Sequence, residues 1–224
     1  MRGIVTGASR GLGLALTRAL SERGWRLAVD ARGAGALEKA VAGIPGVAAI
    51  VGDVADSDHR RRLVETAGEP IDLLVNNASL LGPSPLPLLT RYSLEDLRSV
   101  YEANVFAPLA LVQLSAPRLA PHARVINLVS DAAFEAYEAW GGYGSSKAAL
   151  AHITAVLGAE NPGLRIYAVD PGDMRTQMQQ DAFPGEDVSD RAPPEESVPG
   201  LLTLIEGDLP SGLYRARELV PASA

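Results

Sequence analysis

Near its N-terminus the chain reads Gly3-Ile4-Val5-Thr6-Gly7-Ala8-Ser9-Arg10-Gly11-Leu12-Gly13. The apolar residues 3–6 predict a short buried strand, and the pattern at 12–23 predicts an amphipathic helix. Glycines in the turn between them let the backbone approach a pyrophosphate closely, while the N-terminus of the helix faces the phosphates. The stretch therefore predicts a dinucleotide site at the first strand-to-helix turn. Its candidate contacts are Thr6, Gly7, Ser9, Arg10, Gly11, Leu12 and Gly13.

The same alternation of apolar runs and helical patterns continues along the rest of the chain. Further strands are expected at residues 26–31, 48–52, 72–76, 124–130, 165–169 and 212–219. Helices are expected between them at residues 36–42, 57–67, 94–119, 143–157 and 195–206. Apolar strands separated by helices are typical of a parallel sheet covered on both faces. We therefore expect an α/β fold with a Rossmann-type, doubly wound parallel sheet, formed by a single domain over residues 1–224.

Composition narrows the classes of function. Of the 224 residues 47% are hydrophobic, enough for one sizeable core, and no apolar run reaches the roughly 18 residues of a membrane span. The net charge of −7 argues against a nucleic-acid partner. The lack of cysteine and the scattered His59, His122 and His152 predict no metal site. Because the first strand begins at residue 3, we expect no signal peptide, no membrane partner and a cytoplasmic location.

Tyr143 and Lys147 stand four residues apart at the start of the helix expected at residues 143–157. This spacing puts both side chains on one helix face, so an ammonium can lie beside a phenol. A nearby cation favours the phenolate and lowers a phenol pKa that is ordinarily about 10. The pair therefore predicts a tyrosine that exchanges a proton near neutral pH, although the same spacing is common on solvated helix faces.

The glycine turn, of the form TGxxxGxG, and the Tyr-x3-Lys pair resemble the short-chain dehydrogenase/reductase family in its single-domain branch. The resemblance extends over essentially the whole chain. Further matching motifs, in chain order, are Asp53-Val54, Asn76-Asn77-Ala78-Ser79, Asn104, Ser130, Pro171-Gly172 and Thr176. Ser79 departs from the family, which usually has glycine there. The resemblance implies cofactor contacts at Asp53, Val54, Asn77, Ala78, Ser79, Tyr143, Lys147, Pro171, Gly172, Met174 and Thr176.

The resemblance also implies a catalytic set of Asn104, Ser130, Tyr143 and Lys147. Tyr143 would act as acid or base, Ser130 would polarise the carbonyl, and Lys147 would tune the tyrosine and hold the cofactor ribose. Pro108 lacks the N–H that would bond the carbonyl of Asn104, so the helix should kink there and leave that carbonyl free. In the family, a water on this carbonyl continues a proton relay from the lysine.

Two patterns bear on the choice of cofactor. Asp30 lies about 20 residues beyond the glycine turn, where an acid ordinarily bonds the ribose 2′-hydroxyl of NAD. In the family register, however, the discriminating position is Ala31, followed by Arg32, and Arg10 lies in the glycine turn. Two guanidinium groups can clamp a 2′-phosphate through charge-assisted hydrogen bonds. We therefore expect NADP(H), with NAD(H) as the alternative.

The irregular stretch 173–194 is too long for an ordinary connection. We interpret it as a substrate lid, with a partly disordered loop of no function as the alternative. The expected pocket, which favours a substrate with an apolar portion, is lined by Leu80, Leu81, Ala132, Phe134, Tyr137, Trp140 and Met174. Phe134 and Trp140 could equally belong to the core or to an interface. Family members usually pair through the helices expected at 94–119 and 143–157, so a homodimer or homotetramer is expected.

These observations predict an NADP(H)-dependent oxidoreductase that transfers a hydride between nicotinamide and a small-molecule carbonyl compound or secondary alcohol. Two alternatives remain open from the sequence. One is a redox sensor or regulatory module that binds NADP(H) on the same fold without turnover. The other is a Rossmann-like methyltransferase, which would need neither Tyr143 nor Lys147.

Overall fold

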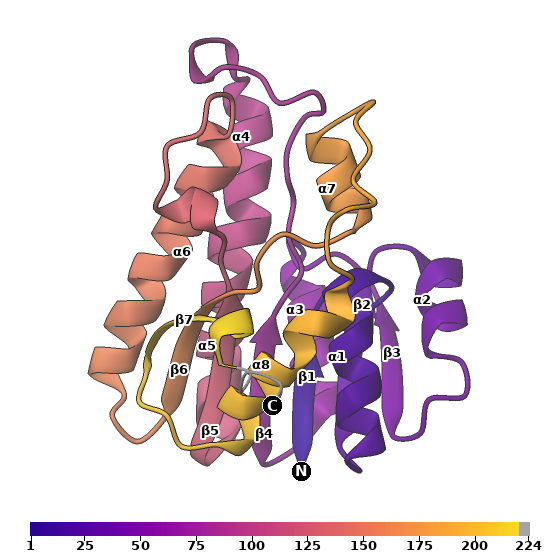
Figure 1. Cartoon of the computed structure of the whole chain (residues 1–224). Coiled ribbons are helices and arrows are strands. Elements are labelled where there is room, and N and C mark those ends of the chain that lie inside the picture. Colours follow the sequence, from indigo (N-terminus) through magenta and orange to yellow (C-terminus); the bar gives the residue numbers. More distant parts are fainter. Residues whose placement is uncertain (220–224) are drawn as a thin grey trace.

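The computed structural model describes residues 1–219, which form a seven-stranded parallel sheet flanked by helices (Figure 1). The strand order is β3-β2-β1-β4-β5-β6-β7, so the direction of winding reverses between β1 and β4. The strands are β1 (Arg2–Val5), β2 (Arg26–Ala31), β3 (Val47–Val51), β4 (Ile71–Asn76), β5 (Leu119–Leu128), β6 (Arg165–Asp170) and β7 (Gly212–Arg215). The predicted doubly wound fold is confirmed. Such sheets bind ligands beyond the carboxyl ends of the strands, at the point of reversal.

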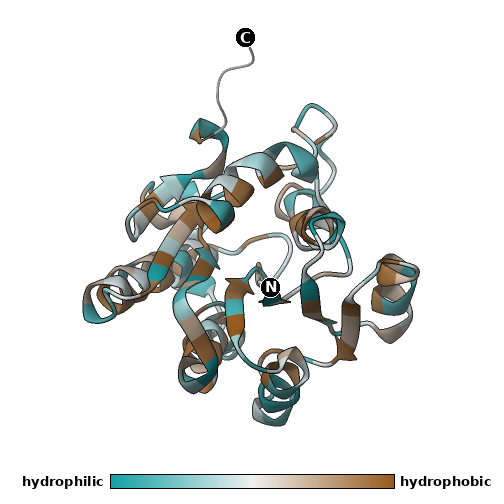
Figure 2. Ribbon diagram, turned by 90° about the horizontal axis from the view of Figure 1, so that it is seen from below, coloured by the Kyte–Doolittle hydropathy of each residue, from teal (hydrophilic) through white to brown (hydrophobic). Residues whose placement is uncertain are grey.

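Helices cover both faces of the sheet. On one face lie α1 (Gly11–Glu22), α2 (Ala34–Val41) and α8 (Val198–Glu206), and on the other lie α3 (Ser57–Ala67), α4 (Leu94–Tyr101), α5 (Ala107–Ser115) and α6 (Gly141–Glu160). Seen from below, hydrophobic residues are coloured on the strands and on helices of both layers (Figure 2), and the buried side chains form a core cluster on each face of the sheet. Within residues 1–219, no helix combines the length and the apolar character needed to cross a bilayer.

The central strands are apolar throughout because both of their faces are covered. In β1, Ile4 packs toward Leu63 of α3, while its neighbour Val5 packs toward Leu16 of α1 on the opposite face. Side chains alternate between faces along a strand, so neighbouring residues belong to different halves of the core. The two halves together hold the strands in register and bring their carboxyl ends to one edge.

The helix expected as one piece over residues 94–119 is interrupted. After α4 comes a π-helical turn, η2 (Glu102–Phe106), then α5 and a 3₁₀ turn, η3 (Ala116–Arg118). Pro108 has no N–H to donate to the carbonyl of Asn104, so the α-helical bonding pattern cannot pass this point. The N–H of Ala107 instead bonds the carbonyl of Glu102, five residues earlier. The interruption expected at Asn104 is therefore a π turn rather than a simple kink.

Two strands, β5 and β7, differ from those expected by more than one residue. β5 was expected at residues 124–130, but it begins at Leu119, which pairs with Ile71 across a register shift in β4, and it ends before Ser130. The last strand was expected to reach residue 219 but ends at Arg215. The chain then forms the 3₁₀ turn η6 (Ala216–Glu218), in which Ala216 is buried against α8.

Residues 173–194 have a structure of their own. They contain the short helix α7 (Gln177–Ala182), and a bridge pairs Met174 with Ala192. The Thr176 hydroxyl caps α7 by accepting the N–H of Gln179 at 3.3 Å. In Figure 1, α7 lies beyond the carboxyl ends of the strands, above the sheet. The segment thus covers the edge at which ligands are expected, which favours the interpretation as a lid.

Candidate active site

The glycine turn between β1 and α1 is fixed by buried hydrogen bonds. Gly7 has a φ of +72°, a conformation that favours glycine, and its N–H donates to Oδ1 of Asp30 at 2.8 Å. The N–H of Ala8 donates to the backbone carbonyl of Asp30, also at 2.8 Å. A Cβ atom on Gly13 would collide with the carbonyl of Gly7, so α1 packs directly against the turn. The turn is therefore shaped before any ligand arrives.

Thr6 joins this turn to the segment that follows β4. Its side chain is buried, and its hydroxyl accepts the N–H groups of Asn77 and Ala78, both at 2.9 Å. The amide of Asn77 donates back to the carbonyl of Thr6 at 2.7 Å. Thr6, through these bonds, and Gly13, through its packing against Gly7, therefore hold the turn in shape without lining the cavity that it borders.

A cavity of about 770 Å³ opens around this turn, and we call it the glycine-turn cleft. The predicted cofactor contacts that line it are Gly7, Ser9, Arg10, Gly11, Leu12, Arg32, Asp53, Val54, Asn77, Ala78, Ser79, Tyr143, Lys147, Pro171, Met174 and Thr176. Of the remaining predicted contacts, Thr6 and Gly13 lie behind the lining, and Gly172 lines the neighbouring pocket. Residues from six separate segments of the sequence thus surround one cavity.

Asp30, the residue that favoured NAD, lines the glycine-turn cleft, but its carboxylate is bonded within the fold. Its side chain is 1% exposed, and while Oδ1 accepts the N–H of Gly7, Oδ2 lies 2.8 Å from Nε2 of the fully buried His59. Both carboxylate oxygens are therefore engaged within the fold. The interpretation of Asp30 as the acceptor of a ribose 2′-hydroxyl is not supported.

Arg32 and Arg10 border the cleft as exposed guanidinium groups. Arg32 follows β2, and its Nη1 lies 4.0 Å from Oδ2 of Asp53, with the arginine side chain 67% exposed. Arg10 immediately precedes α1. Two cations therefore line the cleft, Arg32 directly after β2 and Arg10 in the glycine turn, and these are the residues on which the expectation of NADP(H) rests.

Tyr143 and Lys147 lie one turn apart at the start of α6, and both side chains are buried. Nζ of Lys147 lies 5.5 Å from the centre of the Tyr143 ring and donates to the carbonyl of Leu128, at the end of β5, at 2.8 Å. Burial lowers the pKa of Lys147 to about 7. The lysine can therefore gain or lose a proton near neutral pH.

The expected lowering of the Tyr143 pKa is not found. Burial raises the pKa of this phenol, and the nearby carboxylates of Asp170 and Asp131 raise it further, whereas a hydrogen bond with Ser79 lowers it. Lys147 does not reverse the direction because burial disfavours its own charged form. Tyr143 is thus held as a protonated phenol, ready to act as an acid.

Asn104 is fully buried and lines neither cavity. Its Oδ1 accepts the N–H of Leu80 at 2.8 Å and the hydroxyl of Ser79 at 3.1 Å. Its amide donates to the carbonyl of Leu80 and to the hydroxyl of Ser146, both at 2.9 Å. The π turn thereby ties the segment after β4 to α6, the helix that carries Tyr143.

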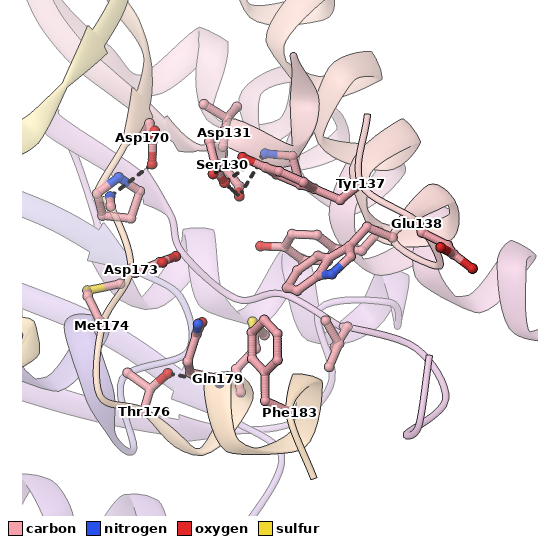
Figure 3. A pocket seen from close by; sticks show the side chains of 18 residues that line it. Ser130, Asp131, Tyr137, Glu138, Asp170, Asp173, Met174, Thr176, Gln179 and Phe183 are labelled. Atoms are coloured by element: carbon pink, nitrogen blue, oxygen red, sulfur yellow. Dashed lines mark hydrogen bonds between the residues drawn. The ribbon is translucent and has the colours of Figure 1, made fainter. Parts of the chain in front are cut away.

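Ser130 lies in the turn that follows β5. Its hydroxyl donates to Oδ1 of Asp131 at 2.8 Å and accepts the N–H of Ala132 at 3.3 Å. The hydroxyl of Tyr137 donates to Oδ2 of the same Asp131 at 3.0 Å (Figure 3). The Ser130 hydroxyl must therefore rotate away from Asp131 before it can donate to a substrate carbonyl.

A second cavity, of about 400 Å³, adjoins the cleft beyond β5 and β6, and we call it the acidic pocket. Its lining is Leu81, Val129, Ser130, Asp131, Ala132, Tyr137, Glu138, Trp140, Tyr143, Asp170, Pro171, Gly172, Asp173, Met174, Thr176, Met178, Gln179 and Phe183. In Figure 3, Asp131, Asp170 and Asp173 lie around one end of this pocket and Phe183 lies at another, while the carboxylate of Glu138 points away.

Two of the residues expected to line the substrate pocket lie elsewhere. Leu80 lines the glycine-turn cleft instead. Phe134 is 54% exposed and lines a surface hollow along α6, because the 3₁₀ turn η4 (Asp131–Ala133) carries the chain outward before it. The other expected residues, Leu81, Ala132, Tyr137, Trp140 and Met174, do line the pocket.

The sequence did not single out the acids of the pocket or the side chains of α7. Asp170 had a usable signal, because it ends β6 directly before Pro171 at the edge where ligands bind. Asp131 likewise follows Ser130. Met178 of α7 and Phe183, which directly follows it, had none, because α7 is too short to show a period in the sequence.

Tyr143 is, among the described residues, the one acid–base side chain that lines both cavities. A proton on its phenol is therefore available to a molecule in the acidic pocket, next to a ligand in the glycine-turn cleft. This arrangement suits a reaction in which Tyr143 transfers a proton to or from a molecule in the acidic pocket while that molecule reacts with the ligand in the glycine-turn cleft.

Comparison with known proteins gives relatives over most of the chain. A family model described as short chain dehydrogenase matches residues 3–187. The chain is 32% identical to 1-deoxy-11-beta-hydroxypentalenate dehydrogenase of Streptomyces arenae, over 78% of this chain and 67% of that protein. It is 30% identical to gluconate 5-dehydrogenase of Gluconobacter oxydans, over 84% and 77%. A short chain dehydrogenase of Escherichia coli CFT073 complexed with NADPH has a TM-score of 0.87 at 25% identity, over 96% of this chain and 95% of that one.

Proposed function

The chain belongs to the short-chain dehydrogenase family, and on that premise we propose that it is an NADP(H)-dependent oxidoreductase of carbonyl compounds or secondary alcohols. One observation carries the proposal: Tyr143 borders both cavities, with Lys147 beside it in the glycine-turn cleft and Ser130 also on the lining of the acidic pocket. The dinucleotide would occupy the cleft and the substrate the pocket. Membership of this family also removes the methyltransferase alternative.

The residues of the cleft suit NADP(H). The glycine turn and the N-terminus of α1 offer backbone N–H groups to a pyrophosphate, and the close packing of Gly13 leaves the turn open to it. Arg10 and Arg32 would hold a 2′-phosphate. Lys147 would bind ribose hydroxyls at the end near the acidic pocket. The NADPH complex of the Escherichia coli relative supports the same assignment.

In the direction of reduction, bound NADPH supplies a hydride to the carbonyl carbon. Tyr143 donates its proton to the carbonyl oxygen, which becomes the alcohol, and its raised pKa keeps that proton in place until the oxygen gains charge. Ser130 turns its hydroxyl from Asp131 to the same oxygen. Lys147, with a pKa of about 7, can carry the positive charge that stabilises the phenolate left on Tyr143. Oxidation of an alcohol reverses each step.

Replacing Tyr143 tests the proposal. Tyr143→Phe should lower kcat by about 10²–10⁴-fold, since the acid is lost, while the Kd for NADP⁺ stays close to that of the parent. The measurement is NADPH consumption over a panel of ketones and aldehydes, with NADP⁺ binding by calorimetry. Tyr101→Phe, a phenol on α4 that lines neither cavity, is the matched control. Full turnover in Tyr143→Phe would remove this residue from the mechanism.

Cofactor preference rests on Arg32 and Arg10 rather than on Asp30. Arg32→Ala should lower the ratio of kcat/KM for NADPH over NADH by about tenfold or more, because charge-assisted hydrogen bonds to phosphate are lost. Asp30→Asn should leave that ratio unchanged and instead lower the free energy of unfolding by about 2 kcal/mol, since its bonds are internal. Arg18→Ala, exposed on α1 and outside the cleft, is the control. An unchanged ratio in both Arg32→Ala and Arg10→Ala would contradict the preference for NADP(H).

A second candidate is a redox sensor that binds NADP(H) without turnover. It is favoured by the Ser130 hydroxyl, which donates to Asp131 and is therefore not directed at a substrate carbonyl. The same carbonyl panel separates the two functions. Tight NADPH binding with no consumption across the panel, in either direction, would support the sensor.

A further inference from the structure

The acidic pocket has an unusual balance of charge for the site of a carbonyl substrate. Asp131, Asp170 and Asp173 gather at one end of it, as Figure 3 shows. Within residues 1–219, no lysine or arginine side chain lines the pocket. A substrate entering the pocket therefore meets carboxylates and no cation.

Asp170 is a buried carboxylate that the protein satisfies only in part. It is 9% exposed, and its Oδ1 accepts the N–H of Gly172 at 2.8 Å. In the described part of the chain, Oδ2 receives no hydrogen bond, and the carboxylate makes no ion pair within 4 Å. Burial raises the pKa of Asp170, and the like charges of Asp131 and Asp173 raise it too, opposed by the Gly172 N–H and by Arg215. A carboxylate in this position gains much from a cation placed beside it.

The carboxylates of Asp131 and Asp173 also favour a cation in the pocket. Asp131 accepts bonds from neutral donors alone, the hydroxyls of Ser130 and Tyr137 and the N–H of Ala132. Asp173, at the mouth of the pocket, lies 4.0 Å from the guanidinium of Arg191, with its own side chain 59% exposed. Its charge is thus only partly balanced. In the described residues, no group of three acidic or histidine side chains is arranged to hold a metal ion, so metal binding does not account for the cluster.

Aromatic rings supply an independent observation. The centre of the Trp140 ring lies 5.9 Å from that of Tyr143, 5.8 Å from that of Phe183 and 6.5 Å from that of Tyr137, and all four residues line the pocket. The faces of such rings attract cations, alkylated ammonium groups above all, and also accept hydrocarbon. Rings and carboxylates together favour the same class of ligand.

We propose that the substrate of this site carries a protonated amine or a quaternary ammonium group in addition to its carbonyl or alcohol, and that Asp170, with Asp131 and Asp173, receives that cation. The inference rests on the proposed oxidoreductase function and names its substrate class. The charge would also assist the chemistry, since Asp170 and Asp131 both oppose ionisation of Tyr143 and a bound cation offsets them. An anionic substrate would be repelled.

Three ketones that differ mainly in charge test the proposal. They are para-acetylbenzyltrimethylammonium, its uncharged isostere para-neopentylacetophenone, and the anion para-acetylphenylacetate. Binding of each to the protein loaded with NADP⁺, which cannot reduce a ketone, is measured by calorimetry. We expect the ammonium ketone to bind at least about tenfold tighter than the neutral isostere and the anion to bind most weakly. A neutral isostere that binds as well as the ammonium ketone, or no measurable binding of the latter, overturns the proposal.

Matched variants assign the preference to the carboxylates. Asp170→Asn should reduce the ratio of ammonium to neutral affinity by about tenfold, and the exposed Asp173→Asn, which cannot disturb the core, by a few-fold. Glu65→Gln changes the net charge equally but lies exposed on α3, away from the pocket, so its ratio should match the parent. Unchanged ratios in both aspartate variants, or an equal fall in Glu65→Gln, overturn the assignment.

Turnover separates this proposal from the function on which it rests. With NADPH, consumption of the neutral ketone without any preference for the ammonium ketone would leave the oxidoreductase in place and overturn the cation site. Selective binding of the ammonium ketone without reduction of any of the three would support the cation site and count against the oxidoreductase.

Discussion

At the scale of the residue, Lys147 shows how burial sets the behaviour of the site. Its side chain is 2% exposed, and burial lowers its pKa from 10.5 to about 7. Between these values the unfolded chain binds more protons at this residue than the folded protein. The contribution of Lys147 to the free energy of unfolding therefore rises with pH across that window. Below pH 7, Lys147 is protonated in both the folded and the unfolded protein, and the folded protein bears the full free-energy cost of burying the charge.

Lys147→Met should remove this dependence. We compare the free energies of unfolding of the variant and the parent without a bound ligand. The variant should gain most over the parent near pH 7, and this gain should fall by at most about 1.4 kcal/mol per pH unit as the pH rises toward 10.5. Urea unfolding of both proteins at a series of pH values measures the difference. Lys39→Met, on the exposed face of α2, is the control. A difference between Lys147→Met and the parent that stays constant with pH would mean that Lys147 is not desolvated.

The same scale shows what the sequence could and could not predict. The sequence could predict that Tyr143 and Lys147 lie together, because residues four apart in a helix share a face. It could also predict the glycine turn, because the turn lies between an apolar strand and a helix. The direction of the Tyr143 pKa could not be predicted, since it depends on burial and on Asp170, which approaches from another strand. For Asp30, sequence distance indicated a place near the cofactor, and the residue does line the glycine-turn cleft, but its bonds to Gly7 and His59 could not be read from the sequence.

At the scale of the element, the π turn η2 gives Asn104 its place. The missing N–H of Pro108 could be read from the sequence, and with it the interruption of the helix. The form of the interruption could not, because it follows from four side-chain bonds that Asn104 makes to Ser79, Leu80 and Ser146. π turns of this kind are frequent at functional sites.

Pro108→Ala should restore an α-helical N–H and draw the chain out of the π turn. Asn104 would then lose its register with Leu80 and with α6, so we expect kcat to fall by about ten- to a hundredfold. The melting temperature should also fall, because the lost hydrogen bonds of the buried Asn104 outweigh the better helix propensity of alanine. Pro117→Ala, in η3, is the matched control. Unchanged kcat in Pro108→Ala would show that the π turn has no part in turnover.

At the scale of the whole molecule, exposed apolar side chains gather at one place on the surface, beside the charged Arg98 and Glu102. Leu94 and Phe106 are 65% and 53% exposed, and with Leu97 and Tyr101 they line a shallow hollow on α4 and η2. Exposed apolar surface of this kind favours contact with a second copy of the chain. The sequence predicted pairing through these helices, and the pattern of exposure agrees with that prediction without testing it.

Phe106→Glu should lower the assembly state, since a buried charge would oppose the contact. Analytical ultracentrifugation of the parent should give a dimer or tetramer, and the variant should shift toward the monomer. Val51→Glu, on the edge strand β3, introduces the same charge elsewhere and should leave the assembly unchanged. A monomeric parent would refute the predicted assembly.

Asp30 links three parts of the molecule at once, since its backbone lies in β2 and its carboxylate meets both the glycine turn and His59 of α3. In many nucleotide-binding sheets, the acid near this position can be exchanged to retune coenzyme usage. Here, replacing Asp30 would remove its bonds to Gly7 and His59 and lower the stability of the fold, and we expect no change in the cofactor that the residues after β2 bind. If the protein prefers NADP(H) as proposed, redesign toward NAD requires a new carboxylate within residues 31–33, with Asp30 left in place.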